Sequence, residues 1–257
     1  MKIIKTIFSK LYLIWVLIVF TVFMIILLPV FILPILIGQK YGYVTYAGLR
    51  AWAWIFSQLT FIRYQIKGKE NVDKDSSYIY SCNHTSFLDV PGLAISVPTQ
   101  FRPLAKKELL KIPVFNLILR VATIIVDRSN PESRRESVNK LTRFLKEGIS
   151  ILIFPEGTQN RTKEPLQPFY DGAFRIAIET QTPIIPIVIV NAGRLMPPSK
   201  FEIKPGKIKV VFGKEISPKG MTLKNIRELK TTVYEQMEAI LLKEDEILAA
   251  THGHLNK

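Results

Sequence analysis

The chain has 257 residues and is 48% hydrophobic, which excludes a disordered or fibrous protein and requires a sizeable buried core. Its 13 Gly and 16 Pro exclude the collagen-like and low-complexity classes. With 35 Lys and Arg against 21 Asp and Glu, the formal charge of +14 suits contact with nucleic acid or with a membrane surface. Cys82 is the single cysteine, so an internal disulfide is excluded and no cysteine cluster is offered to a metal ion.

The first quarter of the chain is basic and free of acids. Glu70 is the first carboxylate, and the basic residues before it are Lys2, Lys5, Lys10, Lys40, Arg50, Arg63, Lys67 and Lys69. These cations flank long apolar runs, and the later part of the chain lacks the interleaved aromatic and basic residues that are typical of nucleic-acid binding. We therefore expect the membrane lipid bilayer, and no nucleic acid, as the partner of this charge.

Leu11–Ile37 is an apolar segment inside a stretch of 29 uncharged residues. As one helix it would reach about 40 Å, beyond the bilayer's hydrocarbon core of about 30 Å. We therefore expect a membrane segment that Pro29 and Pro34 end or kink. A cleaved signal peptide is disfavoured, because the run is longer than the apolar region of a signal and no small-residue cleavage site follows it.

A second stretch, from Tyr43 to Ile62, is rich in aromatic residues and has a single charge, Arg50. Three arrangements are open. The first segment spans the bilayer while the second lies on its surface, or the two form a helical hairpin dipped into one leaflet, or the second is an ordinary core helix. Tryptophan and arginine favour the boundary between membrane and water. A hairpin also places the cations of both flanks on one face, which fits the charge pattern better.

From about residue 60 onward, short apolar runs alternate with amphipathic stretches, which predicts an α/β domain with a mostly parallel sheet and helices on its faces. The expected strands are Phe61–Ile66, Tyr78–Ser81, Phe101–Ala105, Thr123–Val126, Ile149–Phe154, Ile184–Val190 and Lys207–Phe212. The expected helices are Leu88–Val97, Lys107–Arg120, Pro131–Glu147, Gly172–Thr180 and Thr222–Leu248. Asn130 and Gly148 are placed to cap the two ends of the third helix. We accordingly divide the chain into an anchoring segment (1–62), a folded domain (63–250) and a loose tail (251–257).

The segment IYSCNHTSFLDV, residues 79–90, places a histidine directly after a short apolar strand and an aspartate five residues later. Open α/β sheets carry their sites at the carboxyl ends of the strands, so we expect Asn83 and His84 at that edge. Asp89 can accept a hydrogen bond from one imidazole nitrogen and leave the other free to take a proton, which makes His84 a candidate general base. The alternative is that Asp89 only caps a helix and His84 is a polar residue of the edge.

The segment FPEGTQNR, residues 154–161, follows the next buried strand. Its Pro, Gly and Thr indicate a turn whose backbone amides can face an anion, and Arg161 can add a charged fork for a phosphate. Glu156 can orient Arg161 or bind a hydroxyl. A plain turn explains the proline and glycine equally well. Lys106 and Arg128 each follow an expected strand too, so both can lie at the same edge as His84.

Four blocks in this order resemble the glycerolipid acyltransferases of the 1-acylglycerol-3-phosphate type. They are NHTSFLD (83–89), AKKELLKIP (105–113) with VDR (126–128), FPEGT (154–158) and TPIIPIVI (182–189). The resemblance covers about residues 78–213, and four blocks in order are far more specific than any one of them. It implies a mixed, mostly parallel sheet flanked by helices, with an amino-terminal membrane-binding helical pair. It also implies no cofactor and no metal, but an acyl thioester of coenzyme A or of acyl carrier protein as co-substrate.

Carried over position by position, the resemblance makes His84 the base that deprotonates the acceptor hydroxyl and Asp89 the residue that orients it. The alkoxide then attacks the thioester directly, without an acyl-enzyme. The product is phosphatidic acid, made at a membrane from a lysophospholipid acceptor. The same carry-over assigns a set of residues to the acceptor and its phosphate: Asn83, Lys106, Arg128, Glu156, Gly157, Thr158 and Arg161.

The resemblance implies that the protein is located at a membrane, with its catalytic domain on the cytoplasmic face. In a bacterium this would be the inner membrane. Lys2, Lys5 and Lys10 favour a cytoplasmic amino terminus, but Lys40 and Arg50 on the other flank oppose this bias.

Two positions depart from the family's pattern. The family has Arg directly after FPEGT, where this chain has Gln159, and a Gly that often follows the Ile-Pro pair is replaced by Asn116. Glutamine cannot neutralise a phosphate. Either Arg161 substitutes for the missing arginine, or the acceptor is a lysolipid with another head group, such as a lyso amino-acid lipid. An alternative of another class is a non-catalytic peripheral protein that binds anionic lipid, which has no need of His84 and Asp89.

Overall fold

The structure is a computed structural model that describes residues 2–37, 41–111, 115–127 and 129–252. Its strands form one sheet, in the order β1-β7-β6-β2-β5-β3-β4. All seven strands expected from the sequence are confirmed to within one residue. Their bounds are β1 (Ile62–Lys67), β2 (Ile79–Cys82), β3 (Phe101–Lys106), β4 (Ile124–Val126), β5 (Ser150–Ile153), β6 (Ile184–Val190) and β7 (Gly206–Phe212).

Parallel pairing brings the carboxyl ends of five strands to one edge of the sheet. β2 lies between β5 and β6 and runs parallel to both, β3 is parallel to β5, and β4 is parallel to β3. β6 and β7 are antiparallel, so β7 and its parallel partner β1 run the other way. The mixed, mostly parallel sheet is therefore confirmed. Residues that follow β2, β3, β4, β5 and β6 share the carboxyl edge, where we expect the site.

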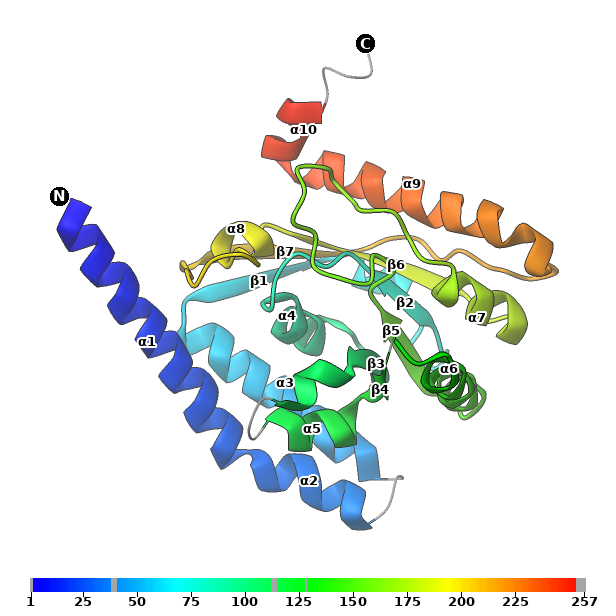
Figure 1. Cartoon of the computed structure of the whole chain (residues 1–257), viewed down its shortest axis with the longest axis horizontal. Coiled ribbons are helices and arrows are strands. Elements are labelled where there is room, and N and C mark those ends of the chain that lie inside the picture. Colours follow the sequence, from blue (N-terminus) through cyan, green and yellow to red (C-terminus); the bar gives the residue numbers. More distant parts are fainter. Residues whose placement is uncertain (1, 38–40, 112–114, 128, 253–257) are drawn as a thin grey trace.

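Helices cover both faces of this sheet (Figure 1). One face carries α3 (Gly42–Leu59) and α4 (Asp89–Ser96), and the other carries α6 (Pro131–Lys146), α7 (Gly172–Thr180) and α9 (Ile226–Glu244). Successive side chains of a strand point to opposite faces. Tyr80 and Cys82 of β2 accordingly enter the core on the α4 side, whereas Ile79 enters the core on the α9 side.

Two expected helices differ from their predicted extent. In place of a helix over residues 107–120 there is a 3-10 turn, η3 (Lys107–Lys111), and α5 (Phe115–Ala122), with residues 112–114 outside the described part. The helix expected over residues 222–248 is divided into η4 (Leu223–Asn225), α9 and α10 (Glu246–His252). The break falls at Asp245, whose backbone is extended and whose carboxylate lies 2.9 Å from Arg194 Nη1.

Asn130 caps α6 as expected, because its Oδ1 accepts hydrogen bonds from the backbone N–H groups of Glu132 and Ser133.

The remaining elements are short. Single turns occur at η2 (Lys69–Asn71) and α8 (Ala192–Leu195). Of the tail expected over 251–257, the two described residues end α10, and residues 253–257 lie outside the described part.

The apolar amino-terminal segment forms α1 (Lys2–Ile26) and α2 (Leu28–Ile37), which meet at an angle (Figure 1). The bend falls at Leu27, two residues before Pro29, whereas Pro34 lies inside α2. By length and composition, the stretch Thr6–Pro34 can cross a membrane. The middle of α1 is nevertheless bound to the rest of the protein. The Tyr12 hydroxyl donates to the carbonyl of Thr60, and Trp15 Nε1 donates to that of Leu59 at 2.9 Å.

α3, the second aromatic stretch, has one face in the core. Trp52 and Phe56 are buried, while Trp54 is 58% exposed. Arg50, which the sequence places near lipid, donates instead to the carbonyl of Val97 at the end of α4, at 2.7 Å. α3 therefore combines a core helix with an exposed aromatic side, and its position at a membrane surface stays a prediction, as does the division of the chain at residue 62.

The packing of α4 on β1 depends on a glycine. A Cβ on Gly92 would lie 2.7 Å from the ring of Tyr64, whose hydroxyl donates to the carbonyl of Leu88 at 2.9 Å. We expect Gly92→Ala to lower the free energy of unfolding by about 1–3 kcal/mol, the usual cost of overpacking. Gly172→Ala, in α7, is the matched control because nothing lies within 4 Å of the added Cβ. Urea denaturation checks both variants, and equal stabilities would contradict this account of the α4 contact.

Candidate active site

His84 and Asp89 lie at the carboxyl edge of the sheet, in the turn between β2 and α4. His84 Nδ1 is 2.8 Å from Asp89 Oδ2. The Asp89 side chain is fully buried, whereas that of His84 is 19% exposed. Because a carboxylate accepts hydrogen bonds, the imidazole proton lies on Nδ1 and the lone pair on Nε2. No residue in the described ranges hydrogen-bonds Nε2, so this nitrogen is open to accept a proton from a bound molecule.

The backbone of the turn fixes the same aspartate oxygen. Asp89 Oδ2 also accepts from the N–H groups of Thr85 at 2.8 Å and Ser86 at 2.9 Å. Asp89 is the first residue of α4, so the turn folds back over the start of the helix. Three donors on one oxygen hold the carboxylate, and therefore the imidazole, in one orientation. The buried charge is also placed to stabilise the imidazolium that forms when Nε2 takes a proton.

The imidazole rests on an aromatic ring supplied by the neighbouring strand end. The rings of His84 and Phe154 are stacked, with centroids 4.1 Å apart and an interplanar angle of 21°. Phe154 follows β5 and packs against the core on the α4 side. This contact limits the rotation of the imidazole and places the ring on the α4 face of the sheet, the face that also carries α1 and α3.

The buried carboxylate of Glu156 links the segment after β5 to the turn that contains His84. Its Oε1 accepts from the backbone N–H of His84 and its Oε2 from that of Gln167, both at 2.9 Å. The residue is 2% exposed. Burial raises the pKa of its carboxyl group above the ordinary value, against these two donors, which act to lower it. Both carboxylate oxygens are thus committed to backbone groups, and Glu156 holds the turn of His84 against the loop that follows β5.

The side chains of Asn83 and Cys82 both have structural roles in the sheet: the first forms hydrogen bonds with β6, and the second is buried in the core. Asn83 Oδ1 accepts from the backbone N–H of Ile189 at 2.7 Å, and its Nδ2 donates to the carbonyl of the same residue at 3.0 Å. This side chain therefore extends the pairing of β2 with β6 by one step. Cys82 is fully buried, and burial raises the pKa of its thiol well above the ordinary value, which disfavours the nucleophilic thiolate.

The other residues assigned to the acceptor are spread along the edge. Lys106 ends β3, two strands from β2, and is half-buried. Gly157 is buried in a left-handed turn with a φ of 72°, which favours glycine, and Thr158 beside it is exposed. Arg161 is exposed. Arg128 lies outside the described residues. Whether any of these side chains contacts an acceptor stays a prediction.

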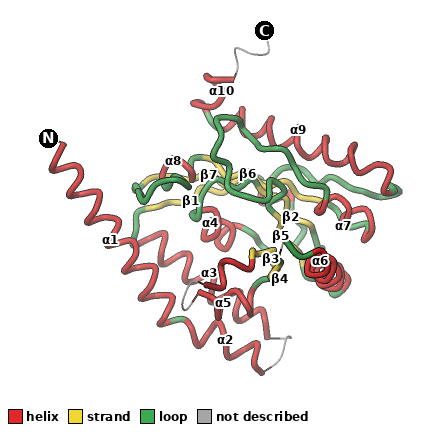
Figure 2. The backbone as a smooth tube through the Cα atoms, viewed as in Figure 1, coloured by secondary structure: helices red, strands yellow, loops and turns green. Residues whose placement is uncertain are grey.

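The sequence does not predict some of the residues that hold His84 and Glu156 in position. Phe154 and Gln167 are the main examples, and the N–H of Asn160 is a third, because it donates to the carbonyl of His84 at 2.6 Å. Phe154 and Asn160 lie in or beside the FPEGT motif, but the sequence does not indicate their roles. Nothing in the local sequence marks Gln167, because its contact comes from the fold of an 18-residue segment, 154–171, without helix or strand (Figure 2).

The role of Glu156 can be tested by stability. Glu156→Gln keeps the size of the side chain but turns an amide donor toward one of the two backbone N–H groups. We expect the free energy of unfolding to fall by about 1–3 kcal/mol, the cost of a buried donor left without an acceptor. Glu70→Gln, at an exposed position, is the control. Chemical denaturation at neutral pH checks this, and equal stability of the two variants would show that the buried carboxylate does not hold the turn.

Known proteins are similar to this chain in sequence, and a solved structure is similar to it in fold. The profile of the Acyltransferase family matches residues 63–190. A 1-acyl-sn-glycerol-3-phosphate acyltransferase of Cocos nucifera is 33% identical over 197 residues, which cover 76% of this chain and 61% of the relative. One from Haemophilus influenzae is 32% identical over 176 residues, covering 68% of this chain and 72% of the relative. The crystal structure of the 1-acyl-sn-glycerophosphate (LPA) acyltransferase PlsC from Thermotoga maritima has a TM-score of 0.79 at 23% identity, over 93% of this chain and 97% of that chain.

The lengths of these relatives differ. The chain spans 61% of the Cocos nucifera relative and 48% of a chloroplastic 1-acyl-sn-glycerol-3-phosphate acyltransferase of Brassica napus. The similarity to the Thermotoga maritima structure shows a shared fold over nearly the whole of both chains. Together with the match to the Haemophilus influenzae relative, these findings confirm the resemblance drawn from the four motifs: the chain belongs to the acyltransferase family that includes the 1-acyl-sn-glycerol-3-phosphate acyltransferases.

Proposed function

We propose that the protein is a membrane-bound 1-acylglycerol-3-phosphate O-acyltransferase. It transfers an acyl chain from coenzyme A or acyl carrier protein to the free hydroxyl of 1-acylglycerol 3-phosphate and gives phosphatidic acid. The observation that carries the proposal is the contact of 2.8 Å between His84 Nδ1 and Asp89 Oδ2, which leaves Nε2 open at the carboxyl edge of the sheet. Membership of the family supports the reaction class.

The chemistry needs a base and no protein nucleophile. His84 Nε2 takes the proton of the acceptor hydroxyl as its oxygen attacks the thioester carbonyl. The new C–O bond forms, the C–S bond breaks, and the imidazolium returns the proton to the leaving thiolate. Asp89 stabilises the imidazolium between the two steps. The burial of Cys82, with a raised thiol pKa, supports direct transfer without an acyl-enzyme on this residue.

The phosphate of the acceptor calls for cations near Nε2. Lys106 supports this role because it is the last residue of β3, whose end lies at the edge shared with His84, and the resemblance adds Arg128. Gln159, where the family has arginine, removes one charge from this set. This departure favours a second candidate, in which the same transfer uses a lysolipid with another head group, such as a lyso amino-acid lipid.

The membrane part of the proposal concerns α1 and α2. Apolar side chains along α1 are exposed, among them Phe8, Leu11 and Ile18. The hydrogen bonds of Tyr12 and Trp15 to the end of α3 hold the middle of α1 beside the catalytic domain. A helix pair that lies in one leaflet agrees with both features, since a helix spanning the bilayer would carry its middle away from the domain. The cytoplasmic face is the expected side.

The base assignment is tested by His84→Ala. We expect acyl transfer to fall by about 10²- to 10⁴-fold, the usual contribution of a general base, while binding to vesicles of anionic lipid is kept. The assay supplies a labelled acyl thioester and a panel of lysolipids to the purified protein. His252→Ala, in α10, is the matched histidine control and should leave turnover unchanged. Unchanged turnover in His84→Ala would refute the base, and wild-type protein that binds lipid but acylates no acceptor would favour the non-catalytic alternative.

The pH dependence of the same assay gives a second test. A protonated imidazole cannot accept another proton, so the rate should fall as the pH is lowered. Single-turnover measurements with saturating substrates ensure that the chemical step is observed. A rate that does not fall as the pH is lowered would contradict a histidine base.

A further inference from the structure

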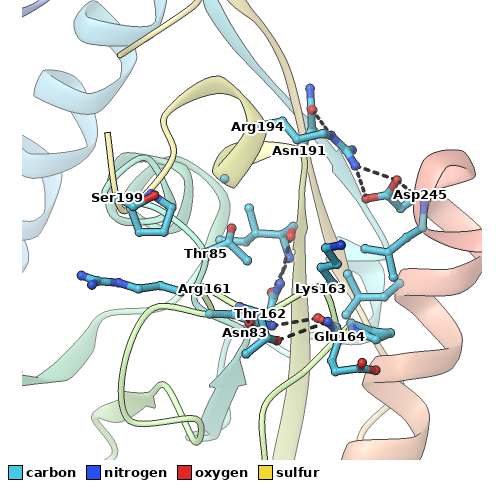
Figure 3. Close-up of a pocket in the computed structure, with 17 residues that line it drawn as sticks. Asn83, Thr85, Arg161, Thr162, Lys163, Glu164, Asn191, Arg194, Ser199 and Asp245 are labelled. Carbon is cyan, nitrogen blue, oxygen red and sulfur yellow. Dashed lines mark hydrogen bonds and ion pairs between the residues drawn. The ribbon is translucent and has the colours of Figure 1, made fainter. Parts of the chain in front are cut away.

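A cavity lies at the same edge of the sheet as His84, between the ends of β2 and β6. Its volume is about 280 Å³. The loop 160–165 forms one wall, the segment 191–199 another, and the end of α9 with α10 closes a third side (Figure 3). Asn83 and Thr85, the two neighbours of His84 in the chain, line this cavity, but His84 does not.

The cavity and the imidazole lie on opposite faces of the sheet edge. His84 is stacked on Phe154, which packs on the α4 side. The cavity is lined by Leu241 and Leu248 of α9 and α10, and α9 covers the other face. The turn 83–85 separates the two. The cavity therefore opens beside the catalytic turn, but away from the face that carries α1 and α3.

The loop supplies cations to this cavity. Arg161 and Lys163 are exposed and form no ion pair with a described residue. Arg194, the third cation, is neutralised, because its Nη1 lies 2.9 Å from Asp245. Figure 3 shows Arg161 and Lys163 extending from the same loop toward different sides of the cavity, with Glu164 at its lower edge. Arg161 and Lys163 outnumber Glu164, the one acid of the same loop that lines the cavity, so this wall keeps an excess of positive charge that suits an anionic group of a substrate.

The chemistry of the two substrates decides which anion fits. In 1-acylglycerol 3-phosphate, one carbon and one oxygen separate the hydroxyl-bearing carbon from phosphorus, so the phosphate must lie close to His84 Nε2. A cavity behind the turn, which His84 does not line, is a poor place for that group. In the acyl donor, the whole pantetheine arm separates the thioester from the nearest phosphate. That phosphate can occupy a separate cavity while the thioester reaches the imidazole.

We propose that the cavity lined by Arg161 and Lys163 binds the phosphate of the donor's phosphopantetheine arm. This proposal rests on the proposed acyl transfer. It divides the two substrates between the two faces of the sheet edge. The acceptor approaches from the face of α1 and α3, and the water-soluble carrier approaches from the face of α9. Arg161 then serves the donor, and not the acceptor phosphate to which the resemblance assigns it.

The test is the double variant Arg161→Ala with Lys163→Ala. We expect the KM for acyl-coenzyme A or acyl carrier protein to rise at least about ten-fold, the effect of losing one charge-assisted hydrogen bond. The KM for the lysophospholipid should change by less than about two-fold. Lys219→Ala with Lys224→Ala is the control, because it removes the same charge from exposed positions that do not line the cavity. A rise in the KM for the acceptor alone, or no change in either KM, would overturn the proposal.

Two further arms sharpen the result. An acyl-pantetheine donor lacks the phosphate, so its KM should be the same in the variant and the wild type. A loss seen with both natural donors assigns the cavity to the phosphate they share, whereas a loss confined to acyl-coenzyme A assigns it to the nucleotide phosphates. Titration calorimetry with free coenzyme A measures the site without turnover. Wild-type protein that binds coenzyme A more tightly than the double variant supports the site even if the acceptor has been wrongly identified, and equal binding would refute it.

Discussion

The buried carboxylate of Asp89 is the constraint on which the candidate site depends. One of its oxygens accepts from the imidazole of His84 and from two backbone N–H groups of the same turn. A charge without access to water is stable in a protein when such donors surround it. The same donors give the imidazole a fixed tautomer and direction, so the interaction that holds the turn between β2 and α4 also orients His84, the proposed base.

A second buried carboxylate, Glu156, fixes the same turn to the loop that follows the neighbouring strand, β5. Glu156 accepts from the backbone of His84 and from that of Gln167, across 72 and 11 residues of sequence. Phe154 adds the aromatic surface under the imidazole. The motif after β5 thus supports the motif after β2, and its side chains divide into those that hold the turn and those, such as Arg161, that face outward. This division separates a proposed base on one face of the sheet edge from a cationic cavity on the other.

The amino-terminal helices fit the same division of faces. α1 and α3 lie on the side of the imidazole, and hydrogen bonds from Tyr12 and Trp15 keep α1 beside the domain. A lipid acceptor held near these helices would reach His84 without crossing the sheet edge, while a carrier dissolved in water would meet the opposite face. The excess of positive charge in the first 69 residues suits an anionic membrane on the first side, and the cations of the loop 160–165 suit an anionic carrier on the second.

The sequence alone determined the strands, because apolar runs covered on both faces are local patterns, and it determined the family through four motif blocks in order. The five-residue spacing at a strand end predicted the pairing of His84 with Asp89 beside the alternative of a helix cap. It did not determine that α9 breaks at Asp245, since the ion pair with Arg194 joins residues 51 apart. Nor did it determine that Asn83 and Glu156 are occupied by backbone groups, or that Arg161 lies in a separate cavity. The direction of a side chain at the sheet edge depends on which strands and loops lie beside it, and only the tertiary structure brings those segments together.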